Sequence, residues 1–279
     1  MKCLAVAWLG LAVVLGAVSA ARSADLPTLK SPAPAAAPPA AAIDWSGFYV
    51  RGVAGWSFGE AAQGYSVSSA WVEANAPSII PFVDGVGSQR LDPRGGDIGP
   101  EVGYDWKLQN GVIVGVAGDV SWGDLAGART TSGTLPVVLL PFSINQQLSE
   151  DWRGALRLKA GVTPLDNLLL YATGGPAVGH FNYTASFWDQ LIPPFLPGNE
   201  TENASFHAFR LGWTAGAGAE WALTRNWAIS AEYRYSDYGA VSGTGVLPLQ
   251  QPPSTAYIGH STGQIGVNSL RLGVGYHFE

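Results

Sequence analysis

Residues 268–279 read NSLRLGVGYHFE, and successive side chains in this stretch alternate in polarity. One file is apolar and consists of Leu270, Leu272, Val274, Tyr276 and Phe278, whereas the other holds Ser269, Arg271, His277 and two glycines. A period of two is typical of a β-strand with one apolar and one polar face. The pattern alone leaves open which face is turned to water, and the arginine in mid-strand makes that question important.

The same alternation recurs in seven further stretches of the chain. They cover about residues 45–58, 97–107, 114–122, 152–162, 168–179, 209–221 and 227–235. The stretch 168–179 is apolar on both faces, so its inward and outward positions cannot be assigned from polarity. Outside residues 4–18, no run is apolar for long enough to cross a membrane as a helix.

The connections between these stretches alternate between short and long. The short ones are QNG (109–111), TPLDN (163–167) and LTRN (223–226), and the long ones cover about 59–94, 123–146, 182–205 and 239–262. Short periplasmic turns and long extracellular loops are typical of barrels in the bacterial outer membrane. The predicted fold is all-β: an eight-stranded antiparallel transmembrane up-and-down barrel with four long extracellular loops.

Aromatic residues gather toward the two ends of the predicted strands. One end collects Trp45, Phe48, Trp106, Trp221, Trp227, Tyr276 and Phe278, and the other collects Trp56, Phe58, Trp122, Trp152, Phe209 and Tyr235. Two aromatic girdles are expected where a barrel crosses the two interfaces of a bilayer. The apolar files are therefore predicted to face lipid, and the file of Arg271 to face the lumen.

The N-terminal region has the features of an export signal. Lys2, the apolar run 4–18 and the small residues that follow predict a signal peptide cleaved after residue 21. A membrane-anchor helix is the alternative, but the run is shorter than the roughly 20 residues that a span needs. Residues 22–43 are rich in proline and alanine, which predicts an extended linker before a barrel over residues 44–279.

Composition excludes several classes of function. Hydrophobic residues make up 47% of the chain and charged residues only 13%, which fits contact with lipid. The net charge of −6 argues against a nucleic-acid partner. The single cysteine, Cys3, would leave with the signal peptide, so no disulfide, thiolate-bound metal or thiol nucleophile is expected in the mature chain.

Several segments together resemble a known family. DWSGFYVRGVAGWSFG (44–59) resembles the first strand of small outer-membrane β-barrel proteins of Gram-negative bacteria, the OmpA/OmpX-like and outer-membrane immunogenic proteins often called the porin family. VGVAGDVSW (114–122), RGALRLKAGV (153–162) and WTAGAGAEWALTRNWAISAEYRYSDYG (213–239) resemble later strands. The resemblance implies a location in the cell outer membrane. It also implies contact with bilayer lipid and lipopolysaccharide, and assembly by the barrel-assembly machinery. Phe278 departs from the family because it is penultimate, before Glu279.

Charged residues recur on the files predicted to face the lumen. They are Arg51, Asp97, Glu101, Asp105, Lys107, Asp119, Arg153, Arg157, Lys159, Arg210, Glu220, Glu232, Arg234 and Arg271. A barrel of eight strands is just wide enough to be filled by its own side chains. Buried charges are tolerated when they are paired, so the sequence predicts a charged network that fills the lumen.

Motifs for chemistry are weak by comparison. GWSFG (55–59) matches the G-x-S-x-G pattern, which requires a strand-to-helix turn, whereas here it lies inside a predicted strand. The histidines, His180, His207, His260 and His277, lack metal-ligand spacing. No catalytic residue, cofactor or metal is predicted. The chain is expected not to be an enzyme, with an outer-membrane lipid hydrolase as a distant alternative.

The long loops contain apolar segments bracketed by prolines: PSIIPF (77–82), LPVVLLPF (135–142), LIPPFLP (191–197) and VLPLQQPP (246–253). Their apolar residues are Ile79, Ile80, Phe82, Val138, Leu139, Leu140, Phe142, Leu191, Ile192, Phe195, Leu247 and Leu249. These side chains either pack together as a cap or form a site for a surface partner or an apolar ligand. The predicted role is structural or one of surface interaction, with narrow porin-like transport of small solutes as the alternative.

Overall fold

The computed structural model describes residues 43–68, 79–136, 139–190, 200–249 and 255–278. The predicted signal peptide (1–21) and nearly all of the predicted linker (22–43) lie outside these residues. Ten strands are present in this part of the chain: β1 (Gly47–Val67), β2 (Arg90–Leu91), β3 (Arg94–Lys107), β4 (Val112–Thr134), β5 (Pro141–Leu165), β6 (Leu168–Asp189), β7 (Glu200–Ala222), β8 (Trp227–Asp237), β9 (Ser242–Pro248) and β10 (Thr255–His277). One α-helix, α2 (Ile79–Gly87), accompanies them.

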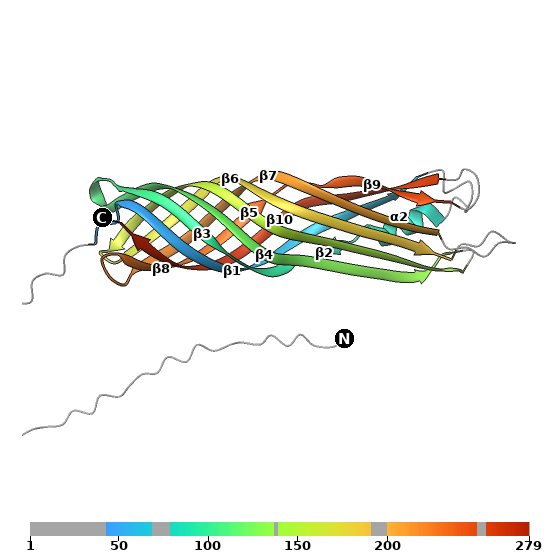
Figure 1. The fold of residues 1–279 in the computed structure, drawn as a ribbon, viewed down its shortest axis with the longest axis horizontal. Coiled ribbons are helices and arrows are strands. Elements are labelled where there is room, and N and C mark those ends of the chain that lie inside the picture. Colours follow the sequence, from blue (N-terminus) through green and yellow to red (C-terminus); the bar gives the residue numbers. More distant parts are fainter. Residues whose placement is uncertain (1–42, 69–78, 137–138, 191–199, 250–254, 279) are drawn as a thin grey trace, which may run out of the picture. The chain divides into compact units, whose positions relative to one another are not determined.

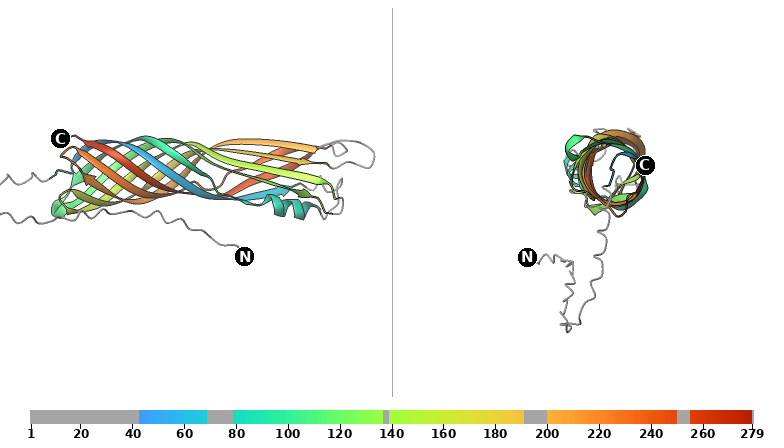
Figure 2. Two further views of the ribbon diagram at one scale, coloured as in Figure 1. Left: turned by 90° about the horizontal axis from the view of Figure 1, so that it is seen from below. Right: turned by 90° about the vertical axis from the view of Figure 1, so that its left-hand side faces the viewer.

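Eight strands close into an antiparallel ring in the order β1-β3-β4-β5-β6-β7-β8-β10 (Figure 1). Closure comes from the pairing of β10 with β1, which runs from Tyr49 opposite His277 to Val67 opposite Ile258. Figure 2 shows the ring end-on. Short β2 and β9 extend the sheet beside β1 and β10. The predicted eight-stranded up-and-down barrel is confirmed.

Tight turns join the strands at one end of the barrel. A single 3-10 turn, η1 (Gln109–Gly111), joins β3 to β4, and two residues join β5 to β6. In η1 the φ angles are 66° at Asn110 and 75° at Gly111. These are the residue types that adopt this region most readily, which explains why QNG forms the turn. In outer-membrane barrels this end faces the periplasm.

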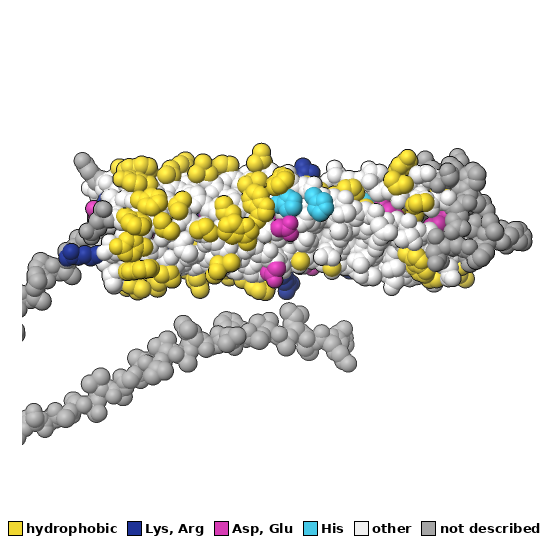
Figure 3. All heavy atoms as spheres, in the orientation of Figure 1, with side chains coloured by type: hydrophobic (Ala, Val, Ile, Leu, Met, Phe, Trp, Pro, Cys, Tyr) yellow, Lys and Arg dark blue, Asp and Glu magenta, His cyan; other side chains and the backbone are white. Residues whose placement is uncertain are grey.

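Large apolar side chains cover the outside of the barrel next to the tight turns. Leu272 is 69% exposed, Leu211 is 83% exposed and Ile98 is 66% exposed. Figure 3 shows hydrophobic side chains gathered over this half and sparse beyond it. This apolar belt runs from about Phe48 to Phe58 on β1 and correspondingly around the ring. Its height of about 10 residues per strand matches the hydrocarbon core of a bilayer.

Trp45 is an exception to the predicted girdles. It is 1% exposed, and its ring nitrogen donates to the backbone carbonyl of Asp166 at 3.2 Å. It packs with Ile113, Leu169 and Tyr171 inside the mouth of the barrel. Trp45 precedes β1, so strand alternation does not govern where its side chain points. Leu169 and Tyr171 are buried while Leu170 is exposed, which fixes the phase of the stretch 168–179.

The strands continue beyond the apolar belt further than the alternation predicted. β1 reaches Val67, β4 reaches Thr134, and β7 begins at Glu200. The polarity of the two faces is inverted here: Tyr65 and Ile144 point inward, whereas Thr184 and Asn203 are exposed. Polar outward positions around an interior with apolar clusters are typical of a sheet surrounded by water, whereas the sequence pattern predicted loops here. This part of the barrel is called the outer section.

Candidate functional site

Charged side chains fill the barrel within the apolar belt. Six cations (Arg51, Arg153, Arg157, Lys159, Arg234 and Arg271) and six anions (Asp97, Glu101, Asp105, Asp119, Glu220 and Glu232) are buried there and ion-paired. Within the belt the equal numbers balance the charge of this charged network, and Glu150 adds a further carboxylate beside Arg153 at the outer edge. Balance matters because an unpaired charge inside a low-dielectric interior is costly.

The charged network is continuous along the barrel. Near the tight turns, Lys159 Nζ lies 2.6 Å from Asp105 and 3.4 Å from Glu220. Glu220 pairs with Arg51 at 2.5 Å, and Arg51 pairs with Glu101 at 2.8 Å. A carboxylate that contacts two cations links side chains at successive heights in the barrel. The ion pairs are therefore connected to one another along the lumen.

Arg157 lies at the centre of this chain of contacts. Its guanidinium reaches Glu101 at 2.5 Å, Asp119 at 2.9 Å and Glu232 at 3.1 Å. Arg157 is on β5, and the three acids are on β3, β4 and β8, so one side chain spans the lumen. The planar fork of arginine suits such multiple contacts with carboxylates.

The charged network ends at the outer edge of the apolar belt. Arg271 contacts Asp119 at 3.1 Å, and Arg153 contacts Asp97 at 2.7 Å. Arg153 also lies 3.7 Å from Glu150, which is 4% exposed. Two hollows within the network measure about 10 Å³ each, which is no more than one water molecule requires.

Two residues predicted for the charged network do not join it. Lys107 is the last residue of β3, and its side chain is exposed because the strand ends there at the turn. Arg210 points inward but is only half-buried, and no ion pair joins it to another described residue. β8 ends at Asp237, opposite Trp213, so Arg210 lies beyond the end of its neighbouring strand. The alternation along a strand predicts whether a side chain points inward or outward. It does not predict where the neighbouring strand ends.

The predicted charged network omitted two residues of this interior. His277 Nε2 lies 2.7 Å from Glu220, and its inward position on the terminal strand was a usable signal. Glu150 was missed because a β-bulge lies between Glu150 and Trp152. The extra residue shifts the phase of β5, so that Glu150 and Arg153 both point inward.

The interior of the outer section contains an apolar cluster that includes part of the predicted loop site, and it also buries polar groups such as Glu202, 2.8 Å from His260 Nε2. Ile79, Phe142, Leu247 and Leu249 are buried in one cluster with Tyr65, Leu135 and Ile258, and Ile80 and Leu140 pack against it. Phe82 is 36% exposed and Leu139 is 75% exposed. Val138, Leu191, Ile192 and Phe195 lie outside the described residues. Most of the described members therefore form a cap rather than an open surface.

In the outer section, helix α2 lies beside β1, beyond the point where pairing with β3 and β2 ends. Asp84 accepts the backbone N–H of Val67 at 2.8 Å, and Gln146 donates to the carbonyl of Gly87 at 3.1 Å. Burial raises the pKa of the Asp84 carboxyl, while the bond from Val67 lowers it. These polar contacts take the place of strand pairing at the edge of β1.

Few side chains in the described part of the chain are arranged for catalysis or metal binding. No cluster of three or more acidic, histidine or cysteine side chains there could hold a metal ion. Among the same residues, no helix has the length and apolarity needed for a membrane span. Ser57 of the GWSFG match points into the lumen and hydrogen-bonds to Asp97 at 3.0 Å and to Arg153 at 2.6 Å. It therefore belongs to the charged network.

Comparison with known sequences identifies the family. The sequence model described as "Outer membrane protein beta-barrel domain" matches residues 33–278. This chain belongs to that family. The protein is accordingly an integral β-barrel protein of the Gram-negative outer membrane, and the apolar belt faces lipid.

Two curated relatives cover most of the chain. The 31 kDa outer-membrane immunogenic protein of Brucella melitensis is 28% identical over 234 residues, which is 81% of this chain and 87% of the relative. The 22 kDa outer membrane protein of Rhizobium leguminosarum is 25% identical over 204 residues, which is 71% of this chain and 76% of the relative. The crystal structure of Ail from Yersinia pestis covers 81% of this chain and 99% of its own, with 16% identity. Its TM-score of 0.31 is too low to support further argument.

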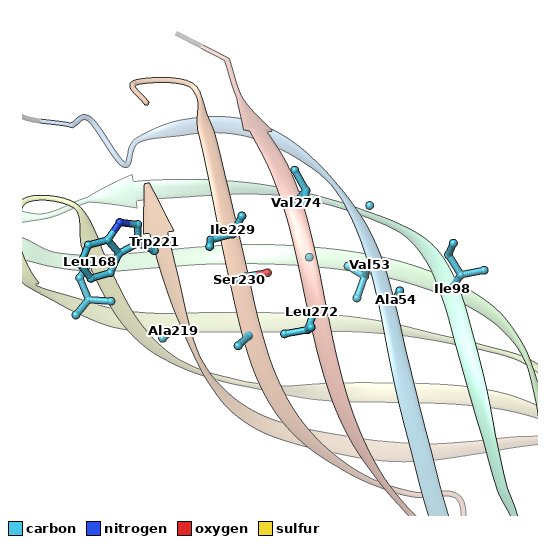
Figure 4. Close-up of a pocket in the computed structure, with 13 residues that line it drawn as sticks. Val53, Ala54, Ile98, Leu168, Ala219, Trp221, Ile229, Ser230, Leu272 and Val274 are labelled. Atoms are coloured by element: carbon cyan, nitrogen blue, oxygen red, sulfur yellow. The ribbon is translucent and has the colours of Figure 1, made fainter. Parts of the chain in front are cut away.

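A large hollow on the outer wall lies within the apolar belt. It measures about 670 Å³ and opens where small residues, Gly52 and Ala54, interrupt larger ones. Figure 4 shows Ile98, Leu272 and Val274 around it. Because the belt faces lipid, acyl chains of the bilayer are its ordinary occupants.

Proposed function

We propose that this protein is a non-enzymatic barrel with a structural or surface-interaction role, and that its charged network closes the lumen to solutes. The observation that carries the proposal is the continuity of ion pairs from Asp105 to Arg153. A solute passing through would have to break these pairs in a medium of low dielectric constant. The side chains packed inside the outer section would obstruct a solute a second time.

Purified protein in a planar bilayer is expected to show no steady single-channel current. A lumen crossed by paired side chains, with hollows of about 10 Å³, leaves no water-filled path for ions. The measurement is single-channel recording at several voltages, with a porin as positive control. Reproducible conductance steps would contradict the closed lumen and support narrow porin-like transport instead.

Surface interaction is proposed for the cap at the outer end. Phe82 and Leu139 supply exposed apolar area above the buried cluster. Leu139 also has a φ of 55°, which is uncommon for a branched apolar residue. Strained, exposed residues of this kind are often found where a protein meets a ligand or partner.

Replacement of Phe82 by Ser and Leu139 by Asn is expected to abolish binding of an apolar fluorescent probe to the outer end. Asn tolerates the positive φ of position 139, so the barrel should keep its heat-modifiable folded band on a gel. Val246→Ser is the matched control, because Val246 is 52% exposed on β9 in the same section. Unchanged probe binding in the double variant would exclude these two residues as the site.

The proposal also covers the export of the chain and its assembly into the outer membrane. We infer that residues 1–21 are removed as a signal peptide and that residues 22–43 form a linker, which N-terminal sequencing of the mature protein would test. The barrel-assembly machinery and lipopolysaccharide are the partners expected of a barrel in this membrane. Phe278 lies on the lipid-facing side at 47% exposure and contacts Phe48, in the position of a terminal aromatic residue.

A further inference from the structure

Three adjacent strands of the outer section carry an ordered array of uncharged hydrogen-bonding side chains. In one rung, Asn145 on β5 lies opposite Ser186 on β6, which lies opposite Asn203 on β7. In the next rung, Gln147 lies opposite Thr184, which lies opposite Ser205. All six side chains are on the outward face. Strand register therefore places three amides and three hydroxyls in two parallel rows.

A hollow of about 350 Å³ lies between the two rungs. The rungs form its sides, and the backbone at Ala185 and Ala204 contributes to its floor. Two residues along a strand set a width of about 7 Å, and three strands set a length of about 10 Å. We call this the trough. Its dimensions suit a short run of sugar rings.

Most outward positions on β1 and β10, across the barrel, differ from those of the trough. On β1 and β10 the outward positions at the same level hold short side chains or none: Ala62, Gly64, Ser66, Gly259, Ser261 and Gly263. The trough instead brings three amide side chains together on β5 and β7, whereas the exposed amide on β10, Gln264, has small neighbours.

The trough is continuous with the lipid-facing surface. The next rung toward the membrane holds Ser149, Asn182 and His207. Below it, Asp151 accepts from Asn182 at 2.7 Å and lies 2.9 Å from His180 Nδ1. The rings of Trp152 and Phe209, at the outer edge of the apolar belt, follow with centroids 6.0 Å apart. A molecule anchored in the outer leaflet can reach the trough without leaving the side of the barrel.

We propose that the trough binds an uncharged saccharide segment of lipopolysaccharide from the surrounding membrane. Amides and hydroxyls both donate and accept hydrogen bonds, as do the hydroxyls of a neutral sugar. Phosphate or carboxylate groups would call for arginine or lysine, and no charged side chain lines the trough. The trough opens laterally on the barrel wall, toward the lipopolysaccharide of the outer leaflet. This inference rests on the proposed function, which names lipopolysaccharide as a partner, and it adds the segment of that molecule and the site on the wall that would hold it.

The test is a calorimetric titration of the full-length protein in detergent with the lipid-free saccharide released from lipopolysaccharide by mild acid. Saturable binding to the wild-type protein is expected. Asn145→Ala combined with Asn203→Ala should weaken it about tenfold or more, because each neutral hydrogen bond contributes a factor of about 2–10. Ser66→Ala combined with Ser261→Ala is the matched control on the opposite wall and should bind as the wild type does.

A second variant distinguishes the loss of the binding site from a folding defect. Asn203→Asp keeps the shape of the side chain but removes its donors and adds a charge, so it should also lower the affinity while the folded gel band persists. Absence of saccharide binding to the wild type overturns the proposal. So does equal weakening in the trough and control variants, and so does binding of lipid A alone with the affinity of whole lipopolysaccharide. None of these results bears on conductance or on apolar probe binding at the cap.

Discussion

The Arg157→Met variant is expected to lower the free energy of unfolding of the barrel by about 3–5 kcal/mol. Arg157 is 1% exposed and contacts three carboxylates, on Glu101, Asp119 and Glu232. Methionine fills a similar volume but removes one of the six cations that face the buried carboxylates, so the charged network gains one uncompensated negative charge. The surplus negative charge cannot be hydrated, because the hollows around it are no larger than one water molecule.

Urea titration of barrels folded into lipid vesicles measures this loss, and two controls isolate its cause. Lys107→Met removes a cation from an exposed site and should change stability by less than about 1 kcal/mol. Leu272→Ala removes a lipid-facing side chain and leaves no buried charge, so its cost should also be smaller than that of Arg157→Met. If Leu272→Ala cost more than Arg157→Met, the inward and outward faces would be assigned backwards.

A compensating variant tests whether charge balance is the reason. Arg157→Met combined with Glu232→Gln restores the wild-type balance of buried cations and carboxylates. Residues in one network are coupled, so the double variant should be more stable than the sum of the two single changes predicts. Arg271→Met should behave as Arg157→Met does, because Arg271 is 3% exposed and lies 3.1 Å from Asp119. Strict additivity in the double variant would argue that packing, not charge, dominates.

The direction of most side chains in the belt could be predicted because period-two alternation is a local property. Arg271 and Leu272 point to opposite faces whatever surrounds the strand, and the aromatic girdles then identify the lipid face. Alternation does not report where a strand ends, which explains Lys107. It also fails across a bulge, which explains Glu150.

The outer section was harder to predict because its environment changes along each strand. A series of polar residues at outward positions fits a loop and a water-exposed strand equally well. Only the pairing with a neighbouring strand distinguishes the two. Helix α2 was missed for a related reason. Pro81 suggested a loop, but it lies in the first turn of α2, where the missing N–H would have had no helical partner. Pairing partners distant in sequence, such as Tyr65 and His260, cannot be read from one strand alone.

The Phe142→Ala variant is expected to destabilise the outer section by about 3–5 kcal/mol while the belt stays folded. Phe142 is 2% exposed, and its ring meets that of Phe82 edge-on at 5.8 Å. Its removal leaves a cavity in an apolar cluster that lies above the charged network and shares no ion pair with it. The bilayer and the network hold the belt independently, because unpaired backbone groups cannot be exposed to lipid.

Hydrogen exchange distinguishes local from global loss. Backbone amides of β4 and β5 above the belt should exchange faster in Phe142→Ala, while those at the level of Arg157 keep wild-type protection. Limited proteolysis should cut only the outer section, and the heat-modifiable band should persist. Val246→Ala is the matched control, because Val246 is 52% exposed on the outward face of β9 and its loss leaves no cavity. Equal acceleration at all depths would mean that the cap and the charged network unfold as one unit, and the cap could then not rearrange around a ligand while the lumen stays closed.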